Sequence, residues 1–221
     1  MVTIVDESRR VSVPGWVTDL ESFRRWTDSD DFPDEGQIWW LRGEVWIDMS
    51  KEQMFTHNVV KAELTMALRL IVTREDLGIY FTDGVLLSNF AANVSGNPDG
   101  MFVSTATLGS DRVRLLEGKE GGFVELQGTP DMVAEILSKS SEDKDDVQLR
   151  QAYFDADIPE YWIIDVRKEP FRFDVLRRTA RGYVNTRKQD GWVKSAAFGR
   201  SLRLVSVKGP GGYPNYRLES R

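Results

Sequence analysis

Three carboxylates stand out because each lies within or at the entrance of a short apolar run. Asp99 and Asp131 each follow a proline and precede a short apolar run. Glu135 interrupts the second of these runs, Met132 to Leu137 (MVAEIL), whose length suits a buried strand. A carboxylate inside such a strand needs a paired charge or a cation. We therefore treat these three acids as candidate ligands.

Carboxylate oxygens are the ligands that hard cations such as Mg²⁺ prefer, with some coordination positions left for water and substrate phosphate. Two carboxylates from neighbouring strands could hold one such ion, which would polarise a phosphodiester and help to generate the attacking hydroxide. A simpler interpretation also stays open. Pro-Asp is a common turn dipeptide, and Glu135 could be one member of an ordinary ion pair.

A lysine would complete such a site, because an ammonium can orient the water or stabilise the charge that develops on phosphorus. Lys139 lies in the Ser-rich segment after the apolar run, and Lys144 lies near the start of the next predicted helix. Of the two we favour Lys144, which could return to the carboxylates if its helix packs across the end of the strand. Both could equally be surface lysines. For His57, at a predicted helix start, surface, capping and catalytic roles remain open.

The elements around Glu135 predict a crossover unit. The buried run Met132 to Leu137 is followed by a helix that runs to about Asp157 and then by a second apolar run, Tyr161 to Val166. Strands joined by such a helix are usually parallel. Because side chains alternate across a strand, Asp131 and Glu135 should share one face.

The remaining pattern predicts one long helix and many strands. A helix is expected over Thr56 to Asp76, since apolar residues recur there at three- and four-residue spacing. A hairpin is expected over residues 38–49. Strands are expected at Ile79 to Leu87, Met101 to Ser104, residues 112–127, Phe171 to Leu176, Tyr183 to Thr186, Trp192 to Lys194 and Leu202 to Val207. The fold class is therefore α/β or α+β, with a β-rich C-terminal part.

Composition narrows the function classes. The chain of 221 residues is 41% hydrophobic and 29% charged, as expected for a globular protein that forms one domain over residues 1–221. It has no cysteine and one histidine, which excludes disulfides, zinc sites built on sulfur and two-histidine metal centres. The sequence has neither an apolar signal core nor an apolar run of the ~18 residues that a membrane span needs. We predict a cytoplasmic protein without a membrane partner.

The charge is distributed unevenly. Residues 1–165 contain 15 Lys and Arg against 31 Asp and Glu, whereas residues 166–221 contain 14 against 4. The basic part could simply be a set of solvated strands, or it could face nucleic-acid phosphates beside an acidic, cation-binding centre. In the second case the binding residues would be those that alternate with aromatic residues, namely Arg172, Arg177, Arg178, Arg181, Arg187 and Lys188.

The run PDMVAEILS…Y…ADIPEYWIID, within residues 130–165, resembles the signature of the Uma-two family of putative restriction endonucleases. That family belongs to the PD-(D/E)XK nuclease superfamily. The similarity extends back through GEVWIDMS…H, which ends at His57, and through NPDGMFVS around Asp99. It extends forward into FRFDVLRR and the basic tail, so that it covers residues 35 to 205.

The resemblance implies a restriction-endonuclease-like core over about residues 35–168, a mixed sheet flanked by helices, followed by a basic β-rich part over 169–221. It implies that Asp99 is the Pro-Asp metal ligand and that Glu135 is the acid of the (D/E)XK element. Asp131 would support or share the ion, and His57 lies where the family often has a histidine. The implied activity is Mg²⁺- or Mn²⁺-dependent hydrolysis of DNA by an endonuclease.

The sequence departs from the family pattern at the lysine. Leu137 lies where the superfamily has lysine, and Leu149 lies where the family commonly supplies one from the following helix. Lys144 and Lys139 are the remaining candidates. An alternative is therefore a catalytically inactive nuclease fold that binds nucleic acid or a protein. A structural or interaction protein that uses its tryptophan-rich face is a further alternative.

A homodimer is also predicted. Trp39, Trp40 and Trp46 are expected to pack in the core or at an interface, and strand edges add further surface for a second copy.

Overall fold

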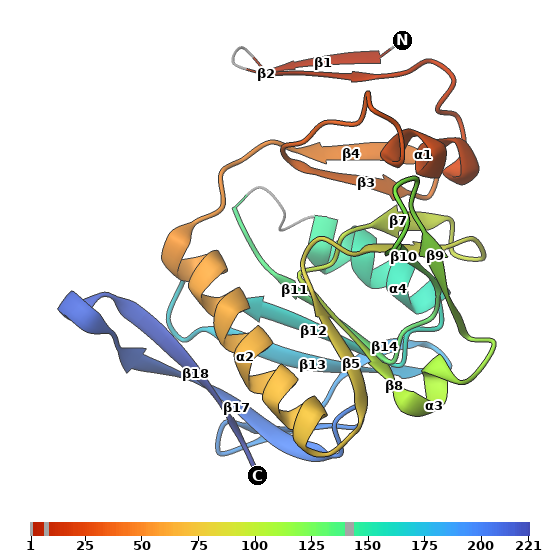
Figure 1. Cartoon of the computed structure of the whole chain (residues 1–221). Coiled ribbons are helices and arrows are strands. Elements are labelled where there is room, and N and C mark those ends of the chain that lie inside the picture. Colours follow the sequence, from red (N-terminus) through yellow and green to blue (C-terminus); the bar gives the residue numbers. More distant parts are fainter. Residues whose placement is uncertain (1, 7–8, 140–143) are drawn as a thin grey trace.

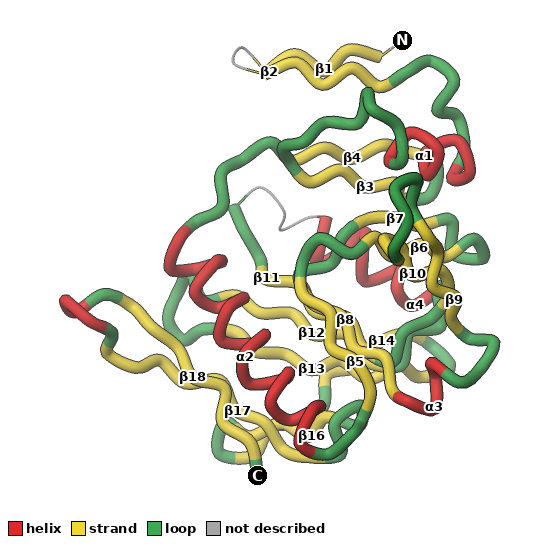
Figure 2. The backbone as a smooth tube through the Cα atoms, viewed as in Figure 1, coloured by secondary structure: helices red, strands yellow, loops and turns green. Residues whose placement is uncertain are grey.

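The computed structural model describes residues 2–6, 9–139 and 144–221. These residues form four β-sheets and seven helical segments, most of them short (Figure 2). Two of the helical segments, η1 and η2, are π-helical turns, and η3 is a 3-10 turn. The helical segments are α1 (Leu20–Thr27), η1 (Met54–Asn58), α2 (Val59–Arg74), α3 (Thr105–Leu108), η2 (Lys144–Leu149), α4 (Arg150–Asp155) and η3 (Pro210–Gly212).

The central sheet has six strands in the order β14-β13-β12-β11-β8-β5. Its strands are β5 (Gly78–Thr82), β8 (Gly100–Ser104), β11 (Met132–Ile136), β12 (Glu160–Asp165), β13 (Arg172–Thr179) and β14 (Gly182–Asn185). Strands β11 and β12 are parallel, and their connection contains η2 and α4. The other neighbours are antiparallel, so the sheet is mixed, and the predicted crossover unit is confirmed. The predicted loop before the helix includes residues 140–143, which lie outside the described residues.

A second six-stranded sheet has the order β4-β3-β7-β6-β10-β9. Its strands are β3 (Gln37–Leu41), β4 (Glu44–Asp48), β6 (Leu86–Asn89), β7 (Val94–Gly96), β9 (Val113–Glu117) and β10 (Phe123–Gly128). The predicted hairpin over residues 38–49 is its β3–β4 pair. Strands β1 (Val2–Asp6) and β2 (Arg9–Val13) form a separate N-terminal hairpin.

The C-terminal part is β-rich, as expected. Its sheet contains β15 (Lys188–Gln189), β16 (Trp192–Ser195), β17 (Arg200–Lys208) and β18 (Pro214–Ser220). The sequence did not predict β18, because only two apolar side chains in it alternate towards the core, Tyr216 and Leu218. Among the described residues, no helix is both long and apolar enough to cross a membrane.

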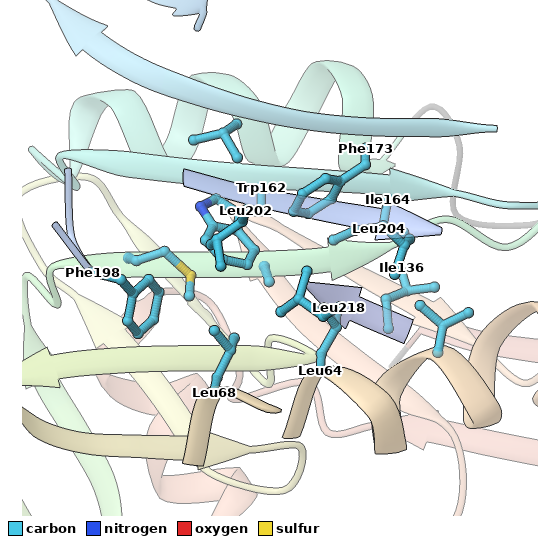
Figure 3. Close-up of a cluster of buried hydrophobic side chains, with 14 of the residues drawn as sticks. Leu64, Leu68, Ile136, Trp162, Ile164, Phe173, Phe198, Leu202, Leu204 and Leu218 are labelled. Carbon is cyan, nitrogen blue, oxygen red and sulfur yellow. The ribbon is translucent and has the colours of Figure 1, made fainter. Parts of the chain in front are cut away.

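One face of the central sheet is covered by α2 and by the C-terminal strands β17 and β18 (Figure 1). Leu64 and Leu68 of α2 meet Trp162 of β12 in this core, together with Leu202 of β17 and Leu218 of β18 (Figure 3). The apolar stripe predicted for this helix therefore faces the sheet.

The opposite face of the central sheet is covered by α4 and the second sheet. Val133 of β11 and Leu137, the residue after that strand, pack there against Tyr153 of α4 and Trp39 of β3. Strand β11 is thus buried on both faces, which explains its nearly continuous apolar sequence. Glu135 alternates with the residues that face α2, so it points towards α4.

The tryptophans that suggested a homodimer surface are mostly interior. Trp39 packs into the α4 core, and Trp40, on the other face of β3, packs against Phe23 of α1. Their exposed fractions are 1% and 2%, while Trp46 is half-buried. The expectation that Trp39 and Trp40 pack in the core or at an interface is confirmed for the core, because strand β3 lies between two cores. The homodimer stays a prediction without that support.

A buried carboxylate joins the central sheet to the C-terminal sheet. Glu160, at the start of β12, accepts hydrogen bonds from Trp162 Nε1 (2.6 Å), Ser195 Oγ (2.5 Å) and the backbone N–H groups of Ala196 (2.7 Å) and Ala197 (3.3 Å). It is 2% exposed. The three donors from residues 195–197 hold the end of β16 against β12.

We expect Glu160→Ala to lower the free energy of unfolding by about 2–4 kcal/mol, because it leaves several buried donors without an acceptor. Urea unfolding monitored by tryptophan fluorescence measures this loss. The control Glu120→Ala removes an exposed acid in a turn and should change stability by less than ~0.5 kcal/mol. Equal stabilities of the two variants would contradict the anchoring role.

Candidate active site

A pocket of about 240 Å³ lies where η1, the entrance of β8 and the end of β11 meet. Six acids line it, which is an unusual density of like charge for a partly enclosed space. They are Asp48, Glu52, Asp83, Asp99, Glu135 and Asp145. The pocket therefore joins two of the three predicted acids, Asp99 and Glu135, with four that the sequence did not single out.

Strand pairing places Asp99 beside the end of β11. Gly100 of β8 is opposite Ala134 of β11, and Asp99 Oδ2 accepts a hydrogen bond from the backbone N–H of Ile136 at 2.8 Å. A side chain at position 100 would not fit, since a Cβ atom there would lie 2.1 Å from the hydroxyl of Tyr80. The Pro-Asp-Gly sequence thus directs a buried carboxylate to the neighbouring strand.

Two cationic side chains from adjacent helical turns contact this carboxylate. His57 Nε2 of η1 lies 3.4 Å from Asp99 Oδ2, and Lys61 Nζ of α2 lies 3.1 Å from Asp99 Oδ1. Lys61 also contacts Glu52 Oε1 at 2.6 Å and Asp83 Oδ2 at 2.9 Å. His57 and Lys61 are four residues apart and therefore lie on the same side of the helix. The ammonium of Lys61 lies among three carboxylates.

These contacts control the protonation of the group. Burial would lower the pKa of His57, but the contact with Asp99 outweighs burial and raises that pKa above its ordinary value. Burial likewise opposes the charge of Lys61, yet Asp99 and the other two acids raise its pKa. For Asp99, burial alone would raise the pKa, while His57 and Lys61 bring it below the usual value. All three charged forms are favoured together.

Glu135 has a different environment. Its side chain is 3% exposed, and its Oε1 accepts a hydrogen bond from the hydroxyl of Tyr153 in α4 at 2.6 Å. Burial, and then the nearby charges of Asp145 and Asp99, raise the pKa of Glu135 well above its ordinary value, against the opposing effect of Lys144. The carboxyl group therefore holds its proton more tightly than an exposed glutamate does.

Lys144 lies in the interior on the Glu135 side of the pocket. Its Nζ is 3.1 Å from Asp145 Oδ1 and 4.6 Å from the ring centre of Trp39. Burial would lower the pKa of Lys144, but Asp145 and Glu135 raise it. The favoured lysine thus returns to the carboxylates, whereas Lys139 is exposed at the rim. Trp39 supplies one wall of this cation site.

Asp131 does not join the group. Its carboxylate accepts hydrogen bonds from the backbone N–H of Ser104 (2.7 Å) and from Thr107 Oγ1 (2.9 Å), and it contacts Arg112. Asp131 is four residues before Glu135, or about 13 Å along an extended strand. The structure thus separates it from the ion that it was expected to support or share, and uses it to fix the end of β8 and the start of α3.

Three residues present ligand atoms close enough together for one metal ion. The nearest ligand atoms of Glu52, His57 and Asp99 all lie within 4.8 Å of one another. His57 Nδ1 and Asp99 Oδ1 are buried and make no hydrogen bond of normal geometry with the described residues, although Lys61 forms an ion pair with Asp99 Oδ1. His57 Nδ1 likewise lies 3.5 Å from Glu52 Oε1. These buried atoms and the carboxylate-rich donor set fit a divalent cation such as Mg²⁺ or Mn²⁺.

Sequence reasoning missed three residues of this arrangement. Glu52 and Asp83 lie in loops and had no pattern to mark them, because their role depends on contacts between distant segments. Lys61 had a usable signal, since it follows His57 by one helical turn and interrupts the apolar character of α2. A lysine at that spacing could have been proposed as a neighbour of the histidine.

The comparison with protein families agrees with this geometry. The family model described as "Uma2: Putative restriction endonuclease" matches residues 20–205, most of the chain. The chain belongs to the Uma2 family. The matched segment contains every residue of the pocket, and the family resemblance of the sequence is confirmed.

A solved structure shares the fold of this Uma2 protein. It is the crystal structure of a putative nuclease belonging to DUF820 from Anabaena variabilis, with a TM-score of 0.59 and 15% sequence identity. The match covers 83% of this chain and 91% of the other. At this identity the similarity shows the fold alone. No curated protein matches the chain significantly.

The raised pKa of Glu135 predicts a pH-dependent stability in the presence of a chelator. The folded protein binds this proton more tightly than the unfolded chain, whose glutamate has a pKa near 4.5. Ionisation of Glu135 therefore lowers stability as pH rises from about 4.5 through the folded-state pKa. Glu135→Gln keeps an acceptor for Tyr153 without the charge, so it should be more stable than wild type at high pH.

Urea unfolding in EDTA at several pH values between 4 and 9 tests this expectation. The advantage of Glu135→Gln should grow with pH and vanish towards pH 4. The control Glu120→Gln, at an exposed position, should follow the wild-type curve. A difference between Glu135→Gln and wild type that does not vary with pH would contradict the assignment.

Proposed function

We propose that this protein is a divalent-metal-dependent endonuclease that hydrolyses phosphodiester bonds of DNA. The observation that carries the proposal is the buried carboxylate of Asp99, which lies between His57 and Lys61 at the end of the strand that holds Glu135. The family match supports the reaction class, and the acidic pocket supports the need for a cation.

Asp99, Glu52 and His57 would hold the ion, and Glu135 would complete the acidic wall beside it. A bound Mg²⁺ or Mn²⁺ would polarise the phosphodiester and lower the pKa of the attacking water. Support for a cation comes from Glu135 itself, since burial and the charges of Asp145 and Asp99 raise its pKa and disfavour its ionisation in the metal-free protein. Added positive charge would let all of these carboxylates ionise together.

The remaining side chains have separate roles in the proposal. Lys144 lies beside Glu135 and would orient the water or stabilise charge on the phosphate, in place of the lysine absent at Leu137 and Leu149. Tyr153 holds the Glu135 carboxyl in place through its hydroxyl. Because a histidine ligand must be neutral, an ion bound there would displace the proton that Asp99 favours on His57 in the metal-free protein.

The alternative is an inactive nuclease fold that binds nucleic acid. Leu137 and Leu149 favour it, because both are fully packed in the α4 core and neither position can present a cation. Lys61 also favours it, since its three ion pairs already neutralise part of the acidic group without a metal. Turnover distinguishes the two functions.

We expect wild-type protein to nick and linearise supercoiled plasmid DNA in Mn²⁺ or Mg²⁺ but not in EDTA. Asp99→Asn and Glu135→Gln should each reduce the rate at least about 100-fold, because each changes the charge that binds or faces the ion. Gel electrophoresis of timed samples measures the rates. Asp111→Asn, at an exposed position outside the pocket, is the matched control.

Cleavage that persists in EDTA, or equal rates in the Asp99 variant and the control, would contradict the proposal. Wild-type protein that binds Mn²⁺ by calorimetry but never cleaves would support the inactive module instead.

The same assay should show which of the two candidate lysines, Lys144 or Lys139, contributes to turnover. Lys144→Ala should lose about 100-fold in turnover while it keeps metal binding, because the ammonium beside Glu135 is removed and the Asp99 group is retained. Lys139→Ala should keep wild-type turnover at saturating DNA, since Lys139 is exposed outside the acidic pocket.

Circular dichroism and Mn²⁺ calorimetry would show that Lys144→Ala is folded and binds the ion. Unchanged turnover in both variants would mean that neither lysine is catalytic.

A further inference from the structure

A second cavity opens next to the acidic pocket. Its volume is about 610 Å³, and four of its lining residues also line the acidic pocket, namely Ser50, Lys51, His57 and Ser138. The others are Gln53, Thr56, Lys139 and Arg167. A ligand that extends beyond the acidic pocket past His57 would enter this cavity.

The two cavities have opposite charge. No acid lines the second cavity within the described part of the chain, and three of its residues are basic. Arg167 is held by hydrogen bonds to both carboxylate oxygens of Asp165 at 2.8 and 2.7 Å. Lys51 and Lys139 are exposed, and neither forms an ion pair with a described residue. Lys51 and Lys139 thus provide positive charge in the cavity next to the acidic pocket.

An aromatic pair, half-buried Phe55 and exposed Tyr213, flanks the same helical turn. Phe55, the neighbour of Thr56, stacks on Tyr213 with 5.1 Å between ring centres and 4° between ring planes. Tyr213 comes from the tip of the β17–β18 hairpin, which reaches towards the start of α2 (Figure 1). Tyr213 is 60% exposed, so part of its ring remains available for a ligand.

We propose that this cavity binds a sugar–phosphate unit of single-stranded nucleic acid next to the scissile bond, an inference that rests on the proposed nuclease function. Lys51 and Lys139 contact the phosphates, and Tyr213, backed by Phe55, stacks on a base. A single strand is favoured because its bases can leave their neighbours and stack on an aromatic side chain, whereas a duplex covers both faces of each base.

Binding measured without turnover tests this proposal. The probes are a fluorescein-labelled twelve-nucleotide oligo(dT) strand and a labelled duplex of equal length, each titrated by fluorescence anisotropy with Ca²⁺ present and checked by gel for integrity. The variants are Lys51→Gln/Lys139→Gln and Tyr213→Ala. Lys194→Gln, an exposed lysine that lines neither cavity, is the matched control.

We expect the single strand to bind wild type more tightly than the duplex. The double variant should bind it at least about tenfold more weakly, and the slope of log affinity against log salt should become shallower by about 1.4, or 0.7 for each phosphate contact. Tyr213→Ala should weaken binding about fivefold or more, and Lys194→Gln should change neither quantity.

Unchanged affinity and salt slope in the double variant would overturn the proposal, and so would tighter binding of the duplex than of the strand. A failure of the proposed nuclease function would give a different combination of binding and cleavage results. The strand would still bind, with the predicted losses in the variants, but Mn²⁺ would produce no cleavage.

Discussion

The carboxylate of Asp99 is the contact on which the site depends. One oxygen accepts the backbone N–H of Ile136 and approaches His57, while the other meets the ammonium of Lys61. Helix α2, the entrance of β8 and the end of β11 are therefore joined through one buried charge. Because a buried charge without partners costs several kcal/mol, these three elements hold each other in place. The two cores on either side of β11 provide the rigidity that this arrangement needs.

The pocket balances its acids with two lysines from different elements. Lys61 neutralises the Asp99 side, and Lys144 serves the Glu135 side from beneath the ring of Trp39. Without further positive charge, burial and the neighbouring acids keep the pKa of Glu135 well above its ordinary value. A divalent ion would compete with Lys61 for Asp99 and would relieve Glu135 at the same time. Metal binding and the protonation of this pocket are therefore expected to be linked.

Much of the fold could be predicted from the sequence, because periodicity records which faces of an element are buried. The stripe of α2, the doubly buried β11 and the crossover to β12 were all readable in this way. The Pro-Asp pair marked Asp99, since it places an acid at the entrance of a short apolar strand. Lys144 was less certain, and its position became clear only from the packing of η2 against the second sheet.

Other residues of the site could not be recognised from a local sequence pattern. Glu52 and Asp83 come from loops that meet only through the tertiary fold, and Lys61 resembled an ordinary polar position on a helix. Asp131 has the same Pro-Asp motif as Asp99 but a different role. Its carboxylate accepts hydrogen bonds from Ser104 and Thr107 and stabilises the local structure. A local motif identifies a buried acid but does not say which neighbours it will meet.

The most direct test of a metal site at Asp99 is anomalous diffraction from a crystal of the wild-type protein soaked in Mn²⁺. We expect one strong peak in the acidic pocket, bonded to an Asp99 oxygen at about 2.1–2.2 Å, with Glu52 or His57 as a second ligand. A pocket that still contains the Lys61–Asp99 ion pair and no peak at saturating Mn²⁺ would contradict it.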